Sequence, residues 1–403
     1  MSKKTTIARL VKPSIKQVTL TSAASVLLLL SACTSNHSHQ TLINNPSHHD
    51  WVNNVINYQQ TGSLESRTAF TISDEMRQTV RNKFAHLRKG KAVEELAQWL
   101  MSEDGHDMRY DLDSNLLPID AFEQKRGNCL SFTILLVNLA KEIGVDLAYN
   151  DVHLPNIWGL ETQQESFILF RHVNAIRKTN KVFQIFDLAL EEYDFGFPQQ
   201  IISERQAKAL LNSNLAVKHL KLGDQKRALD LIKLAIALDS NNADFWINLG
   251  VIFKKDNKLL DAERAFLHAL NLDDTDSLAA SNLEQLYQQK EQHEKAKYFH
   301  ELAFKARQKN PYTHFIKAKE HVGNKHFRDA KKSITKAKRL HKQDPRFFAL
   351  SSVIEQHLNN SASALKDMLK AHQLSVSNDN KQTYSKKAIL LANRIKEAQD
   401  KQF

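Results

Sequence analysis

The spacing of apolar residues predicts that the folded part of the chain starts with helices. Apolar positions recur with the period of an α-helix over residues 73–86 and 92–101, and Ser73 stands where a side chain would cap the first of these helices. A third, apolar helix is expected to begin at or near Cys129 and to end by Gly144, because glycine commonly follows the last turn of a helix.

Strand-like composition follows these helices. Residues 145–152, 166–176 and 181–188 are rich in apolar and β-branched residues, and a turn is expected near residues 178–180. The last two segments should therefore pair as an antiparallel hairpin. Helices followed by antiparallel strands favour an α+β domain, which we place at residues 51–205.

The remainder of the chain repeats every 34 residues. Small residues keep that period in two registers: Ala228, Ala262, Ala296, Ala330 and Ala364, and Ala235, Ala269, Ala303, Ala337 and Ala371. This pattern resembles tetratricopeptide repeats, in which paired antiparallel helices approach so closely that only small side chains fit between them. The second repeat carries the fullest match: Trp246, Leu249, Gly250, Phe253, Ala262, Phe266 and Ala269. We expect five repeats over residues 209–376, an all-α solenoid, and a capping helix with a polar face over 377–403.

The N-terminus has the pattern of a bacterial leader. Five basic residues precede a short apolar stretch that ends in Leu30-Ser31-Ala32-Cys33, and this ending resembles the lipobox of bacterial lipoproteins. The resemblance implies a signal peptide over residues 1–32 and a diacylated Cys33; a plain cleaved signal or an uncleaved anchor is the alternative. Residues 33–50 are polar and are expected to form a flexible, lipidated tether, in which the histidines lack the fixed geometry of a metal site.

Charge and location narrow the range of partners. Loss of the leader would lower the formal charge from +11 to about +6, a mild excess that does not indicate nucleic acid. Thr34 stands where an Asp would resemble an inner-membrane retention signal, so we expect the protein on the periplasmic face of the outer membrane, held there by its N-terminal lipid.

Cys129 is the one cysteine left once Cys33 is lipidated, so it has no disulfide partner within the chain. Its expected place at a helix start favours a thiolate, because the free N–H groups there attract negative charge. His172 lies in an apolar strand, where a histidine is costly without partners, and Asp187 lies in the next strand. Antiparallel pairing of these strands would bring His172 beside Asp187.

Residues Arg126-Gly127-Asn128-Cys129-Leu130-Ser131, followed by His172 and Asp187, resemble the transglutaminase-like superfamily, whose fold also underlies papain-like proteases. The resemblance implies that Cys129 is the nucleophile, His172 the general base and acid, and Asp187 the orienting carboxylate. His153 is the alternative base. The backbone N–H of Cys129 would be one oxyanion donor, while the second stays open among Asn128, Asn156 and Trp158. The chain lacks a clear Trp near the cysteine and lacks the calcium-binding insertions of the animal enzymes.

These expectations combine into one functional hypothesis. The Cys-His-Asp site would hydrolyse an amide or peptide bond through a thioester, without cofactor or metal, and the repeats would bind a protein or peptide partner. The alternative is a catalytically inactive scaffold for envelope protein assembly, and a protein crosslinker is a third hypothesis. The basic fourth repeat is interpreted as a solvated face or as a surface for an acidic peptide or anionic lipid. The sequence does not indicate the oligomeric state.

Overall fold

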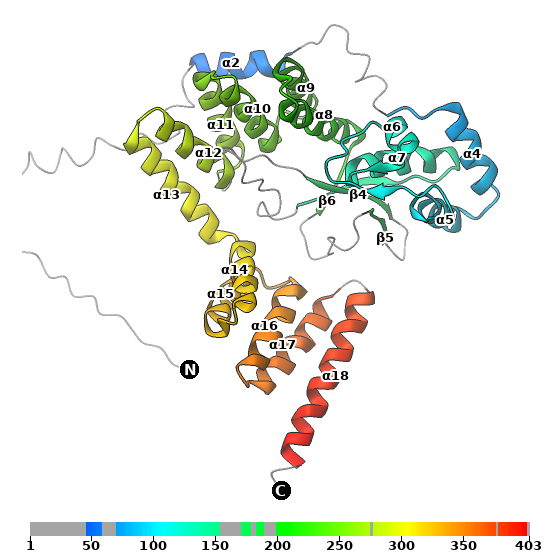
Figure 1. Cartoon of the computed structure of the whole chain (residues 1–403), viewed down its shortest axis with the longest axis vertical. Coiled ribbons are helices and arrows are strands. Elements are labelled where there is room, and N and C mark those ends of the chain that lie inside the picture. The colour runs from blue at the N-terminus through cyan, green and yellow to red at the C-terminus, as the bar shows by residue number, and fades with distance from the viewer. Residues whose placement is uncertain are drawn as a thin grey trace, which may run out of the picture.

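The computed structural model of the 403-residue chain describes residues 46–58, 70–153, 171–178, 183–188, 199–274, 277–375 and 378–400 (Figure 1). The predicted signal peptide, Cys33 and residues 34–45 of the predicted tether lie outside these ranges. Within them, none of the helices has the length and apolarity needed to cross a bilayer.

Helices open the first part of the fold: α4 Asp74–Phe84, α5 Lys89–Met101, α6 Pro118–Glu123 and α7 Cys129–Glu142. The Ser73 side chain caps α4 by accepting a hydrogen bond from the Met76 N–H at 3.2 Å. Helix α7 begins at Cys129 and its chain reverses at Gly144, which has a φ of +71°. That left-handed conformation favours glycine and ends the helix.

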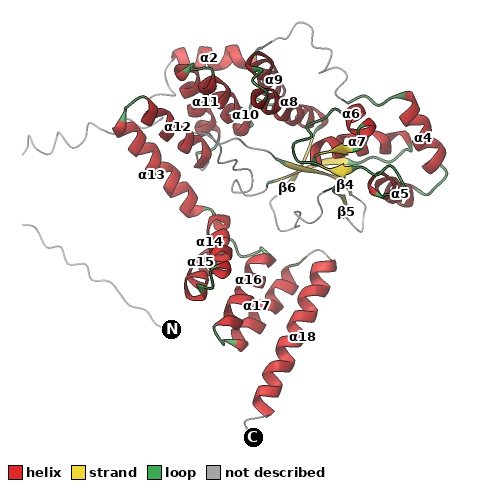
Figure 2. Ribbon diagram, viewed as in Figure 1, coloured by secondary structure: helices red, strands yellow, loops and turns green. Residues whose placement is uncertain are grey.

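Two sheets accompany these helices. A short parallel pair is formed by β1 Arg109–Tyr110 and β2 Arg126–Gly127. The larger sheet has the strand order β5-β4-β3-β6 and is antiparallel throughout, with bounds β3 Ala148–Val152, β4 His172–Lys178, β5 Phe183–Phe186 and β6 Gln199–Ile202. Helix α7 packs against β3 and β4. Figure 2 shows α7 next to the sheet that contains β4.

The predicted hairpin is present. Strands β4 and β5 pair with Ala175 opposite Phe186 and Lys178 opposite Phe183. Strand β3 is shorter than the predicted segment over 145–152, and residues 166–170 of the next predicted strand lie outside the described part. Strand β6 was not predicted, because Gln199-Gln200-Ile201-Ile202 has no apolar alternation and pairs only at the edge of the sheet.

Paired antiparallel helices make up the second half of the chain, a tetratricopeptide-like solenoid. Each pair contains a first and a second helix: α8 Glu204–Lys221 with α9 Gln225–Leu238, α10 Ala243–Lys255 with α11 Leu259–Leu272, α12 Ser277–Gln289 with α13 His293–Lys309, α14 Pro311–Gly323 with α15 Phe327–Leu340, and α16 Pro345–His357 with α17 Ser361–Leu374. All ten alanines of the two registers are buried. The second repeat shows why small residues are needed, because an added Cβ on Gly250 would lie 2.4 Å from the Phe266 ring.

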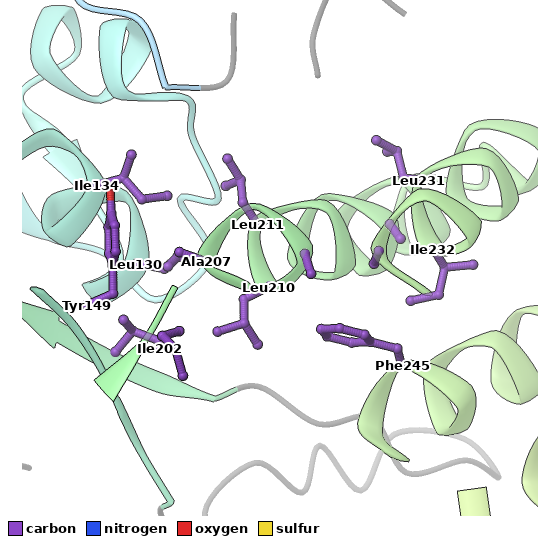
Figure 3. Close-up of a cluster of buried hydrophobic side chains, with 14 of the residues drawn as sticks. Leu130, Ile134, Tyr149, Ile202, Ala207, Leu210, Leu211, Leu231, Ile232 and Phe245 are labelled. Atoms are coloured by element: carbon purple, nitrogen blue, oxygen red, sulfur yellow. The ribbon is translucent and has the colours of Figure 1, made fainter. Parts of the chain in front are cut away.

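A single buried core links the two halves. Helix α8 begins at Glu204, and its residues Ala207 and Leu210 belong to the same hydrophobic cluster as Leu130 of α7 and Ile232 of α9 (Figure 3). The cluster continues to Phe245 in the second repeat. The solenoid therefore packs on the first half rather than hanging from it by a linker.

The predicted tether does not extend to residue 50. Helix α2 covers Pro46–Ile56 and lies along the solenoid beside α9, α10 and α11, although α4 follows at the opposite side of the molecule (Figure 1). Trp51 is 6.2 Å from Trp246, and His48 is 6.0 Å from His268, between ring centroids. The polar composition of residues 46–50 suggested a tether, but burial of His48 and Val52 and packing of the partly buried Trp51 against the repeats stabilise a helix there.

The last helix, α18 Asn378–Asp400, follows the fifth pair. The prediction of a polar outer face is wrong for its middle, because Ile389 and Leu390 are 57% and 59% exposed. Ala388 and Leu391 on the other side are buried against the fifth pair. The helix thus caps the solenoid and also presents apolar surface.

Candidate active site

The structure brings Cys129, His172 and Asp187 together. The Cys129 and His172 side chains are hydrogen-bonded, and His172 Nε2 lies 2.6 Å from Asp187 Oδ2. All three residues are buried. The sulfur, the imidazole and the carboxylate therefore form one continuous chain.

The local sequence explains the position of Cys129. The Asn128 side chain caps α7 by accepting a hydrogen bond from the Ser131 N–H at 2.9 Å, which makes Cys129 the first residue of the helix. The N–H groups of a first helical turn have no acceptor within the helix and carry a partial positive charge. This environment favours a negatively charged sulfur.

A loop fixes the start of α7 from the other side. The Ser131 hydroxyl donates to the Leu116 carbonyl at 2.7 Å and accepts from the Leu116 N–H at 3.1 Å. Gly127 allows the close packing, because a Cβ there would lie 2.9 Å from Met108 Cε. Asp111 forms an Asx turn, accepting from the Asp113 N–H at 3.1 Å. These contacts hold Cys129 in place without the use of its own side chain.

The strand register explains how Asp187 meets His172. Since Ala175 pairs with Phe186, continuation of the register places Asn174 opposite Asp187. His172 lies two residues before Asn174 on the same face of β4, so the carboxylate reaches both side chains. Asn174 Nδ2 donates to Asp187 Oδ2 at 3.0 Å.

The charges of the site support one another. Burial lowers the pKa of His172, but the Cys129 sulfur and the Asp187 carboxylate, which both favour the imidazolium, together raise that pKa to about 10. The arrangement thus favours the charged form of the His172 imidazole. A buried charge is tolerated when it is paired in this way.

Several residues that position the site were not predicted. Asn174 accepts a hydrogen bond from Asn150 Nδ2 at 2.9 Å, which ties Asp187 to the neighbouring strand β3. The Thr133 hydroxyl donates to the Val173 carbonyl at 3.0 Å and joins α7 to β4 one turn beyond Cys129. The sequence signals that could have found them are spacings. Asn174 lies two residues after His172, on the same face of a strand, and Thr133 lies four residues after Cys129, on the same face of a helix.

The alternative residues are placed differently. His153 Nε2 lies 3.2 Å from Asp151 Oδ2, and the hydrogen bond of Cys129 is made with His172. The Asn128 side chain is occupied, because Nδ2 donates to Asn115 Oδ1 at 2.5 Å while Oδ1 caps the helix. Asn156 and Trp158 lie outside the described residues. Across the residues that the structure describes, no three His, Cys, Asp or Glu side chains gather as a metal site.

Comparisons with known proteins add only distant likenesses. No protein-family model matches the chain. No curated protein matches it either. Among solved structures, it is similar to YrrB, a TPR protein with an unusual peptide-binding site, at 17% identity over 44% of this chain and 92% of that chain, with a TM-score of 0.23.

Two other solved structures have comparable scores. PilF of Pseudomonas aeruginosa is 17% identical over 49% of this chain and 87% of that chain, with a TM-score of 0.26. A thermophilic TPR protein from Thermus thermophilus is 16% identical over 45% and 99%, with a TM-score of 0.24. The assignment of the repeats therefore rests on the helix pairs and the buried alanines of this chain.

Proposed function

We propose that the first half of the chain is a transglutaminase-like α+β domain that performs acyl transfer through Cys129. The observation that carries this proposal is the hydrogen-bonded chain from Cys129 through His172 to Asp187. A nucleophile, a base and a group that orients the base are what acyl transfer requires of a protein.

The reaction follows from this geometry. The Cys129 thiolate attacks the carbonyl carbon of an amide, and the imidazolium of His172 donates its proton to the leaving nitrogen as the C–N bond breaks. The acyl group is left on sulfur as a thioester. Water then adds to the thioester as His172 takes its proton, the C–S bond breaks, and a carboxylic acid is released with the thiolate restored.

Two further features favour this chemistry. The N–H of Cys129 lies in the first turn of α7 and is placed to donate to the oxyanion that forms on the attacked carbonyl. Asp187, held by Asn174, keeps the imidazole in one orientation as it gains and loses its proton. We favour water over an amine as the second substrate, so the proposed activity is amide or peptide hydrolysis.

Alkylation of Cys129 tests the proposed ion pair without knowledge of the substrate. The full chain carrying Cys33→Ser would be treated with iodoacetamide across a pH series. We expect the rate near pH 6 to stay within about threefold of the rate near pH 9, whereas a free thiol with a pKa of about 8.5 loses about two-hundredfold over that range.

The matched variant for this experiment is His172→Gln, which should restore the steep pH dependence of a free thiol. If the chain without this substitution already behaves as a free thiol, the acyl-transfer proposal is wrong. The catalytically inactive scaffold then describes the protein.

We further infer that the solenoid binds an acidic protein segment. A groove of about 490 Å³ between α16, α17 and α18 has Met368, Leu390 and Leu391 along its apolar lining and Lys387 and Arg394 at its rim. Apolar lining with cations at the edge fits a peptide that carries both apolar and acidic side chains.

The fourth repeat is a weaker candidate for the surface that binds this acidic segment, because several of its cations already have carboxylate partners. Lys331 lies 2.9 Å from Glu355, and Lys338 lies 2.8 Å from Asp367. The groove next to α18 therefore carries the more accessible positive charge.

Photo-crosslinking in cells tests the partner proposal. A photoreactive residue in place of Leu390 should label an Asp- or Glu-rich segment of another protein, and the same residue in place of Leu112, which is equally exposed, should not. Lys387→Glu with Arg394→Glu should abolish the Leu390 product. Equal labelling at both positions, or labelling that survives the charge reversal, would contradict the proposal.

We also propose that Cys33 carries lipid and holds the protein at the periplasmic face of the outer membrane. The leader pattern and the residues before Cys33 support this. Metabolic labelling with a fatty acid should mark the chain that keeps Cys33 and should not mark the Cys33→Ser variant. Absence of label on both proteins would contradict the proposal that Cys33 carries lipid.

A further inference from the structure

The residue immediately before His172 is bound to the second repeat. Arg171 Nε donates to Asp244 Oδ2 at 2.5 Å, and Arg171 Nη1 donates to Asp151 Oδ2 at 3.0 Å. Asp151 belongs to β3 of the first half, and Asp244 lies in the first turn of α10. One guanidinium therefore joins the sheet to the solenoid next to the imidazole.

This ion pair differs from the other charged contacts between the two halves. The Arg171, Asp244 and Asp151 side chains are 24%, 11% and 4% exposed, whereas those of Lys141 and Glu204, which also join the halves, are 45% and 43% exposed. Buried charges whose partners are fixed hold their geometry much more firmly than surface pairs do. Loss of one partner leaves an uncompensated charge.

The solenoid also reaches the strand paired with His172. Val152 is opposite His172 in the β3–β4 register and is fully buried. It belongs to the same hydrophobic cluster as Tyr312 of α14 and Phe347 of α16. Repeats well separated along the chain thus contact the end of the sheet where the imidazole lies.

His172 is the first residue of β4, so the backbone hydrogen bonds of the sheet hold it from its C-terminal side. The contact from Arg171 to Asp244 holds the chain on its other side. Arg171 immediately precedes β4 and is tied by its guanidinium to Asp151 and Asp244, so it anchors the backbone next to His172.

We propose that Asp244 is a positioning residue for the candidate active site, and that the second repeat is thereby part of the acyl-transfer unit. This inference rests on the proposed function, since it assigns Asp244 the task of keeping the His172 ring within reach of the Cys129 sulfur. A shift of about 1 Å in such a group lowers rates by as much as about a hundredfold.

The test uses the full chain with Cys33→Ser and compares Asp244→Asn with Glu204→Gln. Asp244→Asn keeps the shape of the side chain and removes its charge, while Glu204→Gln removes the exposed contact with Lys141, 3.1 Å away, far from β4 along the chain. Alkylation of Cys129 by iodoacetamide would be measured near pH 6 and near pH 10, and the melting temperature would be recorded for each variant.

We expect Asp244→Asn to slow alkylation near pH 6 by about tenfold or more and to leave the rate near pH 10 unchanged, because at high pH the sulfur ionises without help from the imidazole. Asp244→Glu should recover most of the rate near pH 6. Glu204→Gln should leave both rates unchanged. A variant that merely unfolds would change both rates, so the difference between the two pH values isolates positioning.

Two results overturn the inference. In the first, Asp244→Asn and Glu204→Gln both give the same alkylation rates as the parent chain. In the second, the two variants lower the alkylation rate near pH 6 equally. Failure of the proposed function looks different: the parent chain itself would then show no enhanced reactivity near pH 6, and His172→Gln would have no effect.

Discussion

The tightest steric contact of the repeats predicts a clear effect of one methyl group. In Gly250→Ala, the new Cβ would lie 2.4 Å, 2.6 Å and 2.8 Å from three atoms of the Phe266 ring. Both residues are inside the second repeat, and Phe266 is fully buried, so the ring would have to move against packed neighbours. Overpacking of this kind costs about 3 kcal/mol, while replacement of glycine by alanine in a helix returns about 1 kcal/mol. We expect a net loss of about 2 kcal/mol.

Gly323→Ala is the matched control. Gly323 ends α14, also in the solenoid, and an added Cβ meets nothing within 4 Å. The same substitution should therefore stabilise this helix by about 0.5–1 kcal/mol. The assay is urea unfolding followed by circular dichroism, with the midpoint and slope compared for the two variants.

The double variant Gly250→Ala with Phe266→Leu gives a second check, because a smaller side chain relieves the contact. Its loss should be smaller than the sum of the two single losses. Gly250→Ala at or above the stability of the parent chain would refute the packing argument, as would strictly additive losses.

Three further predictions concern polar groups inside the fold. Asn174→Ala removes a hydrogen bond to the Asp187 carboxylate and one from Asn150, so it should cost about 3 kcal/mol in urea unfolding; a loss below about 1 kcal/mol would show that the network is dispensable. The pKa of His172 is raised to about 10 from an ordinary 6.5, so its stabilising contribution is complete below about pH 6.5 and is lost as the pH rises toward 10. The difference in unfolding free energy between the parent chain and His172→Gln should therefore shrink over that interval. A constant difference would contradict the raised pKa of His172. Partial burial, reinforced by His48 and His49, lowers the pKa of His268 to about 4, so its contribution is present above pH 6.5 and is lost as the pH falls toward 4. His268→Phe should flatten the acid side of the stability curve, and an unchanged curve would argue against a neutral His268.

Much of the architecture follows from local patterns. The alanine registers predict the repeats because close helix contacts demand small residues at a fixed period. The start of α7 at Cys129 follows from the Asn128 cap, and the pairing of β4 with β5 follows from two apolar segments that are close together in the sequence. These features depend on residues that are near one another in the sequence.

Features set by distant contacts were missed. Helix α2 is polar by composition, and it is stabilised by Trp246 and His268, some two hundred residues away along the chain. The contact between Arg171 and Asp244 joins two segments with no common pattern. The exposed apolar residues of α18 are adjacent to its buried ones, so their orientation depends on how the helix docks against α17.

We propose that the Cys129 sulfur is an anion paired with the His172 imidazolium. The most direct measurement is the ultraviolet absorbance of the thiolate, taken as the difference between the full chain with Cys33→Ser and the same chain that also carries Cys129→Ser. We expect thiolate absorbance to be present already near pH 6, and we expect His172→Gln to move its appearance up toward the ordinary thiol value of about 8.5. Absorbance that appears only near that ordinary value in both proteins would contradict it.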